Sequence, residues 1–195
     1  MKRVADVLSS SLLLVALGVP MLVVALAIRW RDGTPVLFRQ QRMGRFGRPF
    51  TILKFRTMRP PRQGDAEVSS GGTDQRITPI GQTLRRHRID EWPQLWNVLR
   101  GDMSMVGPRP EVPRFVNLQD PQWKAVLQVR PGITGPDALA FKDEGDLLSE
   151  SDDPESTYRK DILPDKLKMQ EEYARNRSMA GDIGLLFRTL GALRG

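Results

Sequence analysis

The stretch RRHRIDEWPQLWNVLRGDMSMVGPRP, from Arg85 to Pro110, decides how this chain is expected to fold and to act. It places two adjacent carboxylates, Asp90 and Glu91, just before Pro93. Proline suits the first position of a helix, because the N–H that it lacks would have no partner there. Apolar residues then recur at helical spacing until Gly101, which is typical of a helix end. A helix is therefore predicted to begin directly behind the carboxylate pair.

The start of this helix favours negative charge, because its free N–H groups and its dipole attract anions. The anion is either Asp90 itself or a bound phosphate. Basic residues precede the pair, and the rigid turn Pro108-Arg109-Pro110 follows the helix. Taken alone, a charged residue ahead of a proline start is structural more often than catalytic, so a functional interpretation depends on the rest of the chain.

Composition limits the chemistry that is available. The chain has 195 residues, enough for one domain with a sizeable core, a net charge of +7 and a pI near 10.2. This charge predicts an anionic partner: nucleic acid, phospholipid or a phosphorylated substrate. Because the chain has no cysteine and a single histidine, His87, thiolate and multi-histidine metal sites are excluded. Carboxylates, arginines, lysines and an oxygen-bound metal such as magnesium remain.

Residues 1–30 form an apolar segment that suits a membrane. A spanning helix needs about 20 apolar residues, and this segment supplies them. A signal peptide is the competing interpretation, but the apolar run is long for one and Asp6 lies inside its beginning. Residues 1–30 are therefore predicted to be embedded in the membrane.

Pro20 is expected to break this membrane helix, because proline lacks an N–H and clashes with the preceding turn. About 16 residues precede it, or roughly 24 Å, short of a hydrocarbon core of about 30 Å. Basic residues flank both ends of the segment, which favours keeping both ends in the cytoplasm. These features predict a re-entrant helix-break-helix. A spanning helix stays the alternative, since proline kinks are common in spanning helices too.

Residues 31–195 are predicted to form a cytoplasmic, interfacial catalytic domain. A small β-hairpin is expected from strands at 34–38 and 50–58 with a basic turn between them. Amphipathic helices are expected at 115–129 and 182–193, and the second either lies on the membrane or packs in the core. Residues 59–73 and 142–166 are predicted to be loops, and 130–135 a tight turn. The predicted fold class is α/β, mainly helical, in a monotopic membrane protein.

Two further sets of basic residues are candidates for phosphate contacts. Lys54 and Arg56 lie two residues apart in the second predicted strand, so they share a face that could clamp a diphosphate, although such a pair is usually solvated. Arg85 stands five residues before Asp90, on a helix that either rests on phospholipid or aims an arginine at the carboxylates.

Several motifs, in the same order over nearly the whole chain, resemble the bacterial sugar transferases, also called monotopic phosphoglycosyl transferases. The ordered set of motifs is specific for this family, whereas one motif alone would be weak evidence of the resemblance. The motifs are the apolar N-terminus with its internal proline, FRQ at 38–40, RMG at 42–44, KFRTM at 54–58, DEWPQLWNVL at 90–99, GDMSMVGPRP at 101–110 and RPGITG at 130–135. The length resembles the minimal catalytic form of the family.

The resemblance implies transfer of a phospho-sugar from a UDP-sugar to a polyprenol phosphate, with release of UMP, at the cytoplasmic face of the bacterial inner membrane. This step would initiate a surface glycan or a glycoprotein glycan. Asp90 is implied to be the nucleophile of a covalent phospho-sugar intermediate, and Glu91 to hold Mg²⁺ together with Asp90. The implied partners are the UDP-sugar, polyprenol phosphate and membrane lipid, but no nucleic acid.

The resemblance also assigns the phosphate and nucleotide contacts. These fall to Lys54, Arg56, Arg85 and Arg109, with Pro108 and Pro110 fixing the last arginine. The chain departs from the family in having Val19-Pro20 where many members have Ser-Pro. After Gly135 it lacks the tryptophan-alanine-glutamine pattern of many members, so the identity of the sugar cannot be carried over.

A non-enzymatic alternative explains the same overall charge. In it, the N-terminus anchors a basic module that binds anionic lipid or nucleic acid. Only the enzyme explains why Asp90 and Glu91 lie among basic residues and tight turns, whereas only a nucleic-acid binder predicts a steep dependence of binding on salt.

Overall fold

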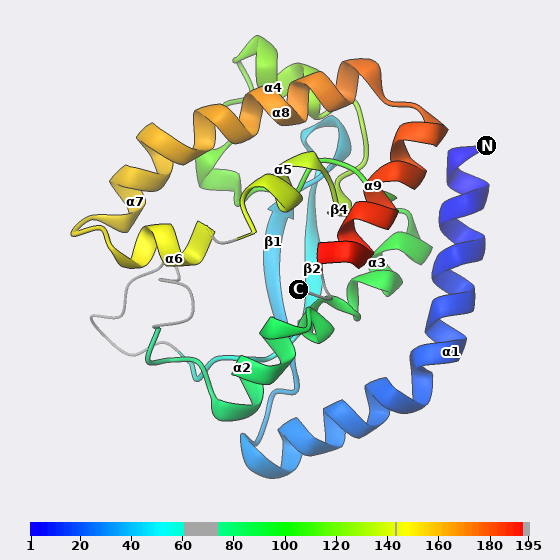
Figure 1. Cartoon of the computed structure of the whole chain (residues 1–195), viewed down its shortest axis with the longest axis vertical. Coiled ribbons are helices and arrows are strands. Elements are labelled where there is room, and N and C mark those ends of the chain that lie inside the picture. The colour runs from blue at the N-terminus through cyan, green and yellow to red at the C-terminus, as the bar shows by residue number, and fades with distance from the viewer. Residues whose placement is uncertain (61–73, 143, 193–195) are drawn as a thin grey trace.

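The structure is a computed structural model that describes residues 1–60, 74–142 and 144–192 (Figure 1). It is mostly helical around a small sheet, as the sequence predicts. The helices are α1 (Lys2–Arg31), α2 (Pro79–Arg86), α3 (Gln94–Arg100), α4 (Pro121–Val126), α5 (Pro136–Ala140), α6 (Glu144–Ser149), α7 (Pro154–Thr157), α8 (Leu163–Asn176) and α9 (Met179–Ala192). The strands are β1 (Leu37–Met43), β2 (Pro49–Phe55), β3 (Ser104–Val106) and β4 (Gly132–Thr134).

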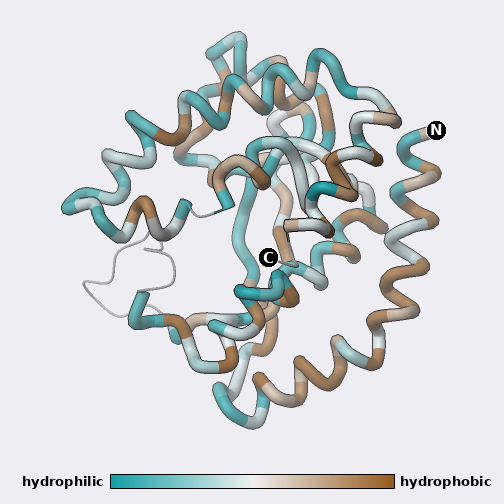
Figure 2. Tube along the Cα trace, viewed as in Figure 1, coloured by the Kyte–Doolittle hydropathy of each residue, from teal (hydrophilic) through white to brown (hydrophobic). Residues whose placement is uncertain are grey.

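Helix α1 is a single helix of 30 residues that contains Pro20 and bends about midway (Figure 1). It is long and apolar enough to cross a membrane, and almost none of its apolar length is buried in the protein. Figure 2 shows that apolar residues dominate α1, whereas α8 is mostly hydrophilic. The predicted break is therefore a bend in a continuous helix. Whether this helix re-enters one face of the membrane stays a prediction.

Both ends of α1 are attached to the rest of the protein. At its start, Arg3 donates hydrogen bonds to Val98 O and Leu99 O at the end of α3, at 2.6 and 2.9 Å. The buried Asp6 accepts hydrogen bonds from Ser104 Oγ at 2.9 Å and from a neighbouring backbone N–H. At its far end, Ile28 is fully buried in an apolar cluster with residues of β2 and α2.

The antiparallel hairpin of β1 and β2 crosses the centre of the molecule (Figure 1). Leu37 pairs with Phe55 and Met43 with Pro49, so β1 extends into residues predicted to form the turn. Helix α3 is hydrogen-bonded directly to β2 by the buried Asn97. Its Oδ1 accepts from Leu53 N at 3.0 Å, and its Nδ2 donates to Thr51 O at 2.8 Å. The helix behind the two carboxylates is thus fixed to the strand that carries Lys54.

Strand β3 pairs with β4 in parallel, which corrects the prediction of a tight turn at 130–135. The two segments approach so closely that a methyl group on Gly132 would lie 2.1 Å from Gly107 N. Gly107 N donates to Thr134 O at 2.9 Å, and Gly132 N donates to Pro108 O at 2.9 Å. These glycines let the segment before Arg109 pack directly against the later segment.

Residues 142–166 are largely helical where the structure describes them, so the predicted loop is wrong there. Helices α6 and α7, a π-helical turn (Tyr158–Ile162) and the start of α8 occupy this range. Their buried apolar residues share one core with Phe115 and Trp123. The predicted helix at 115–129 is shorter, because only α4 forms there. Most of the loop predicted at 59–73 lies outside the described residues.

Helix α9 has two different sides. Ile183, Phe187 and Leu190 are large apolar side chains exposed along it. Asp182 is buried, and Thr189 shares a hydrogen bond of 2.7 Å with Thr134. As far as Ala192, the tail predicted at 182–193 is therefore a helix that packs on the body on one side and leaves an apolar stripe exposed.

Candidate functional site

The two predicted catalytic carboxylates lie in a short 3₁₀ turn (Ile89–Glu91) between α2 and α3. The preceding residue, Arg88, has a φ of 53° in the left-handed region, which reverses the chain after α2. Asp90 and Glu91 are both buried. The turn therefore directs two neighbouring carboxylates into the protein instead of into solvent.

Glu91 brings together two of the predicted cations. Lys54 Nζ and Arg109 Nη2 each donate to Glu91 Oε1 at 2.8 Å. Burial alone would raise the pKa of Glu91, but ionic attraction from Arg109 and Lys54 outweighs it and holds this pKa well below its usual range. Glu91 is therefore ionised, and both of its charge partners contact the same oxygen.

Asp90 is held differently from its neighbour. Its side chain accepts no hydrogen bond from the residues that the structure describes. Burial raises the pKa of Asp90; Lys54 opposes this shift and the charge on Glu91 adds to it. Asp90 is thus a carboxylate without hydrogen bonds to the described residues, and its burial disfavours its ionised form. It lies next to Glu91, which binds two cations.

Arg85 is close enough to Asp90 for its positive charge to act on that carboxyl, where it partly offsets the rise in pKa that burial causes. Its contact with phosphate stays a prediction. Its Nη1 is buried and has no hydrogen-bond partner within the described part of the chain. A buried unpaired donor is costly, so an anion beside Arg85 would satisfy it.

Arg56 is placed apart from this group. Its guanidinium donates to Thr34 O at 2.7 Å and to Asp32 O at 2.5 Å, in the loop that follows α1. Strand β2 ends at Phe55, so the alternation that put Lys54 and Arg56 on one face does not extend to Arg56. Its contact with phosphate stays a prediction, and its present partners fix the loop that follows α1.

Two residues that the sequence did not reveal hold the backbone of Arg109. Asp137 accepts a hydrogen bond from Arg109 N at 3.2 Å, and Gln170 Nε2 donates to Arg109 O at 3.2 Å. Gln170 also donates to Asp137 Oδ2 at 2.6 Å, and both side chains are almost fully buried. Asp137 lies where the chain departs from the family pattern, and nothing distinguishes Gln170 from other polar residues of its helix.

A second buried polar network lies behind the Pro108-Arg109-Pro110 turn. Glu111 accepts hydrogen bonds from Tyr158 Oη at 2.5 Å and from Lys166 Nζ at 3.3 Å. On the other side, Arg42 donates to Pro110 O at 3.2 Å. The turn is therefore supported from both directions by satisfied polar groups, so Arg109 emerges from a rigid base.

The carboxylates fit a metal site that substrate oxygens would complete. The part of the chain that the structure describes contains no group of three or more metal-ligating side chains. Only the oxygens of Asp90 and the second carboxylate oxygen of Glu91 remain free of the contacts above. Magnesium commonly binds to one or two carboxylates together with substrate phosphates. The donor set suits Mg²⁺ in that form and does not suit an all-protein cage.

Comparison with known proteins gives a match over almost the whole chain. A family model described as bacterial sugar transferase matches residues 1–194. Among curated proteins, the UDP-glucose:undecaprenyl-phosphate glucose-1-phosphate transferase of Caulobacter vibrioides is 45% identical over 69% of this chain and 51% of its own length. The undecaprenyl-phosphate glucose phosphotransferase of Komagataeibacter xylinus is 39% identical over 97% of this chain and 35% of its own.

A third relative is named for a different sugar. The UDP-N-acetylgalactosamine-undecaprenyl-phosphate N-acetylgalactosaminephosphotransferase of Aeromonas hydrophila is 34% identical over 97% of this chain and 42% of its own. The chain thus spans about half of the first relative's length and less of the other two. The alternative of a non-enzymatic basic module finds no support, since all three relatives carry transferase names.

Gln170→Leu should destabilise the protein, because it leaves Arg109 O and Asp137 without their buried donor. Each lost buried bond of this kind costs about 1–3 kcal/mol, so we expect the Tm in detergent, followed by circular dichroism, to fall by several degrees. Gln128→Leu is the matched control, since Gln128 is exposed in the turn after α4 and its side chain donates only to the nearby Lys124 O among the described residues. Equal Tm values for the two variants would show that Gln170 does not hold the Arg109 turn.

Proposed function

The chain belongs to the bacterial sugar transferase family, and on that premise we propose that it transfers a sugar 1-phosphate from a UDP-sugar to a polyprenol phosphate. The names of the relatives support this, since each describes transfer of a sugar phosphate to undecaprenyl phosphate. The products would be UMP and a polyprenyl-diphosphate-linked sugar. The reaction would supply the first lipid-linked intermediate of a glycan.

The contrast between Asp90 and Glu91 carries this proposal. Lys54 and Arg109 both bind Glu91 Oε1, and their positive charges offset the charge of this carboxylate, which makes it the weaker nucleophile of the two. Asp90 lies in the same turn, accepts no hydrogen bond and is close enough to the same cations for their charge to act on it. The pair therefore offers one carboxylate for holding cations and one for attack on phosphorus.

The proposed chemistry proceeds in two substitutions at one phosphorus atom. An ionised oxygen of Asp90 attacks the phosphorus that bears the sugar, and the bond from this phosphorus to the oxygen of UMP breaks. The phosphate oxygen of the polyprenol then attacks the same phosphorus, and the bond to Asp90 breaks. Asp90 returns to its carboxylate form, so no net change remains on the protein.

The surrounding cations answer the main electrostatic problem of this reaction. A carboxylate that approaches a diphosphate is repelled by it, so fixed positive groups must offset the charge on the phosphoryl oxygens. Arg85 offers a buried donor without a partner, and Lys54 and Arg109 are held in place by Glu91. We assign the diphosphate to the space that these three side chains share with Asp90.

Asp90→Asn should abolish UMP release while leaving the fold intact. The amide cannot act as the attacking group, so turnover should fall by more than about a thousandfold. Because Asp90 accepts no hydrogen bond, its replacement by asparagine should not lower the Tm. The measurement is UMP release by the detergent-purified protein with polyprenol phosphate and a panel of UDP-sugars, including UDP-glucose and UDP-N-acetylgalactosamine.

Asp165→Asn makes the same chemical change at an exposed site on α8 and serves as the control. Incubation with the UDP-sugar alone should also raise the intact mass of the wild-type protein by that of a phospho-sugar. Full turnover by Asp90→Asn would remove Asp90 as the nucleophile. Failure of the wild type to release UMP from any UDP-sugar would argue against the proposed function itself.

We further propose that Asp90 and Glu91 hold Mg²⁺ together with the substrate. When bound, the ion would neutralise charge on the diphosphate. The free oxygens of the two carboxylates support this assignment, and the missing ligands would come from the substrate and water. Glu91 would then balance the ion with one oxygen while its other oxygen keeps Lys54 and Arg109 in position.

Removal of divalent cations should therefore stop turnover. We expect excess EDTA to reduce UMP release to background, and added Mg²⁺ to restore it. EDTA that has been saturated with Mg²⁺ beforehand is the control for effects of the chelator itself. Undiminished release in free EDTA would exclude a required metal.

We also propose that α1 re-enters the cytoplasmic side of the bacterial inner membrane and does not cross it. Both ends of α1 contact the same body, Arg3 through α3 and Ile28 through β2 and α2. A straight spanning helix would carry these ends to opposite sides of the bilayer. Basic residues at both ends support a cytoplasmic location.

Because the chain contains no cysteine, single cysteines can report this topology. A cysteine added ahead of Lys2 and a cysteine at Arg48, in the exposed turn of the hairpin, should both resist a membrane-impermeant maleimide in intact inner membrane. Both should react once the membrane is permeabilised. Labelling of the first cysteine alone from the periplasmic side would favour a spanning helix.

A further inference from the structure

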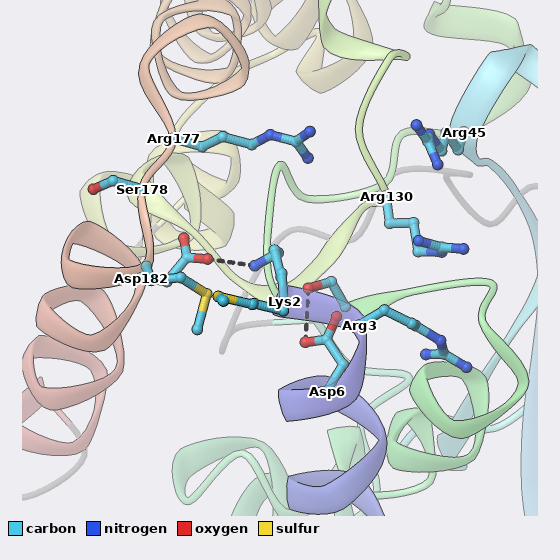
Figure 3. A pocket seen from close by; sticks show the side chains of 11 residues that line it. Lys2, Arg3, Asp6, Arg45, Arg130, Arg177, Ser178 and Asp182 are labelled. Carbon is cyan, nitrogen blue, oxygen red and sulfur yellow. Dashed lines mark hydrogen bonds and ion pairs between the residues drawn. The ribbon is translucent and has the colours of Figure 1, made fainter.

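A cavity of about 350 Å³ lies at the N-terminal end of α1 (Figure 3). It is bounded by α1, the hairpin turn, the segment before β4 and the junction of α8 with α9. It shares none of the residues of the candidate active site. The side chains that line it are Met1, Lys2, Arg3, Asp6, Arg45, Ser104, Arg130, Arg177, Ser178, Met179 and Asp182.

Five basic and two acidic side chains line this cavity, and both acids already have partners. Asp182 pairs with Lys2 Nζ at 2.5 Å, and its other oxygen accepts from Tyr173 Oη at 2.6 Å. Asp6 accepts hydrogen bonds from Ser104 Oγ and Met105 N. The carboxylates of the cavity are thus occupied, and four arginines remain.

These four arginines have no carboxylate partner among the residues that the structure describes. Arg3 and Arg130 donate to backbone carbonyls at the end of α3, Arg130 through Nε to Gly101 O at 2.8 Å. Arg45 donates to Gln128 O at 2.8 Å, and no hydrogen bond involves the side chain of the exposed Arg177. Figure 3 shows the four side chains, from four separate parts of the chain, around one open space.

The clustering of these guanidinium groups is itself unfavourable. Burial, followed by the charges of Arg3 and Arg45, lowers the pKa of Arg130. Arginine presents several donors in a planar fork that suits phosphate oxygens, and most of those donors are unused here. A bound anion would relieve the repulsion and take up the free donors.

Apolar side chains border the cavity and continue away from it. Met1 and Met179 line it and are exposed. Val4 on α1 and Ile183 on α9 follow within about one turn of each helix and are also exposed. The cavity therefore opens where two exposed apolar helix faces begin. A ligand with a phosphate at one end and hydrocarbon at the other matches this layout.

We propose that this cavity binds the phosphate of an anionic phospholipid headgroup, with the acyl chains lying against the apolar faces of α1 and α9. The apolar border is the reason to prefer a lipid over free phosphate. A volume of about 350 Å³ is within the range of small-molecule sites, about 300–1,000 Å³. The proposal does not use the transferase activity, so it stands or fails separately from it.

Native mass spectrometry of the detergent-purified full chain tests this lipid site. The protein is titrated with dioleoyl phosphatidylglycerol, dioleoyl phosphatidylcholine and inorganic phosphate. We expect phosphatidylglycerol to bind at least about tenfold more tightly than phosphatidylcholine, and inorganic phosphate not to displace it. Arg177→Gln and Arg130→Gln should each weaken phosphatidylglycerol binding by about ten- to a hundredfold, the loss of one charge-assisted contact.

Arg175→Gln is the matched control, because Arg175 is exposed on α8 and pairs with Glu171 outside the cavity. Arg177→Gln guards against misfolding, since the Arg177 side chain makes no hydrogen bond or ion pair with the residues that the structure describes, and circular dichroism checks the fold of both variants. Equal binding of the two lipids, or equal loss in Arg175→Gln and Arg177→Gln, would overturn the proposal. Displacement of the lipid by millimolar phosphate would assign the cavity to a soluble anion and would also overturn it.

Discussion

The contact of Glu91 with Lys54 and Arg109 joins three segments that lie far apart in the sequence. Lys54 comes from β2, Arg109 from the turn after β3, and Glu91 from the turn between α2 and α3. Glu91 is buried, so the loss of either cation would leave its charge only partly compensated, at a cost that the partial exposure of Lys54 and Arg109 reduces. This contact therefore constrains how the three segments can be arranged. It involves Glu91 only, so the neighbouring Asp90 keeps a side chain without hydrogen bonds to the described residues.

Local features of the sequence predicted much of this site. The proline start behind Asp90 and Glu91 and the helix end at Gly101, which has a φ of 95°, depend only on near neighbours, so pattern alone could locate them. The long apolar helix and the hairpin were predicted for the same reason. The catalytic roles came from the family resemblance and stay proposals. The alternation of a strand predicted that Arg56 would share a face with Lys54, but β2 ends at Phe55. The Arg56 side chain instead contacts the loop that follows α1.

Long-range contacts account for what the sequence did not reveal. Strand β4 forms only because Gly132 can lie against Gly107, and a parallel pairing between distant segments leaves no periodic pattern in either. The acidic stretch after residue 142 looked solvated, yet part of it folds onto a core shared with Phe115 and Trp123. Gln170 contacts Arg109 across 61 residues of sequence, and its role is visible only in the folded chain.

The ion pair between Lys2 and Asp182 has a consequence for the order of biosynthesis. The two residues are 180 positions apart, so the ribosome makes Lys2 well before Asp182. Helix α1 is therefore synthesised before its partner, and its first turn cannot acquire this contact until α9 has been translated. Closure of the N-terminal end of α1 against α9 therefore follows the synthesis of α9, and a nascent chain stalled before α9 would hold α1 without this ion pair.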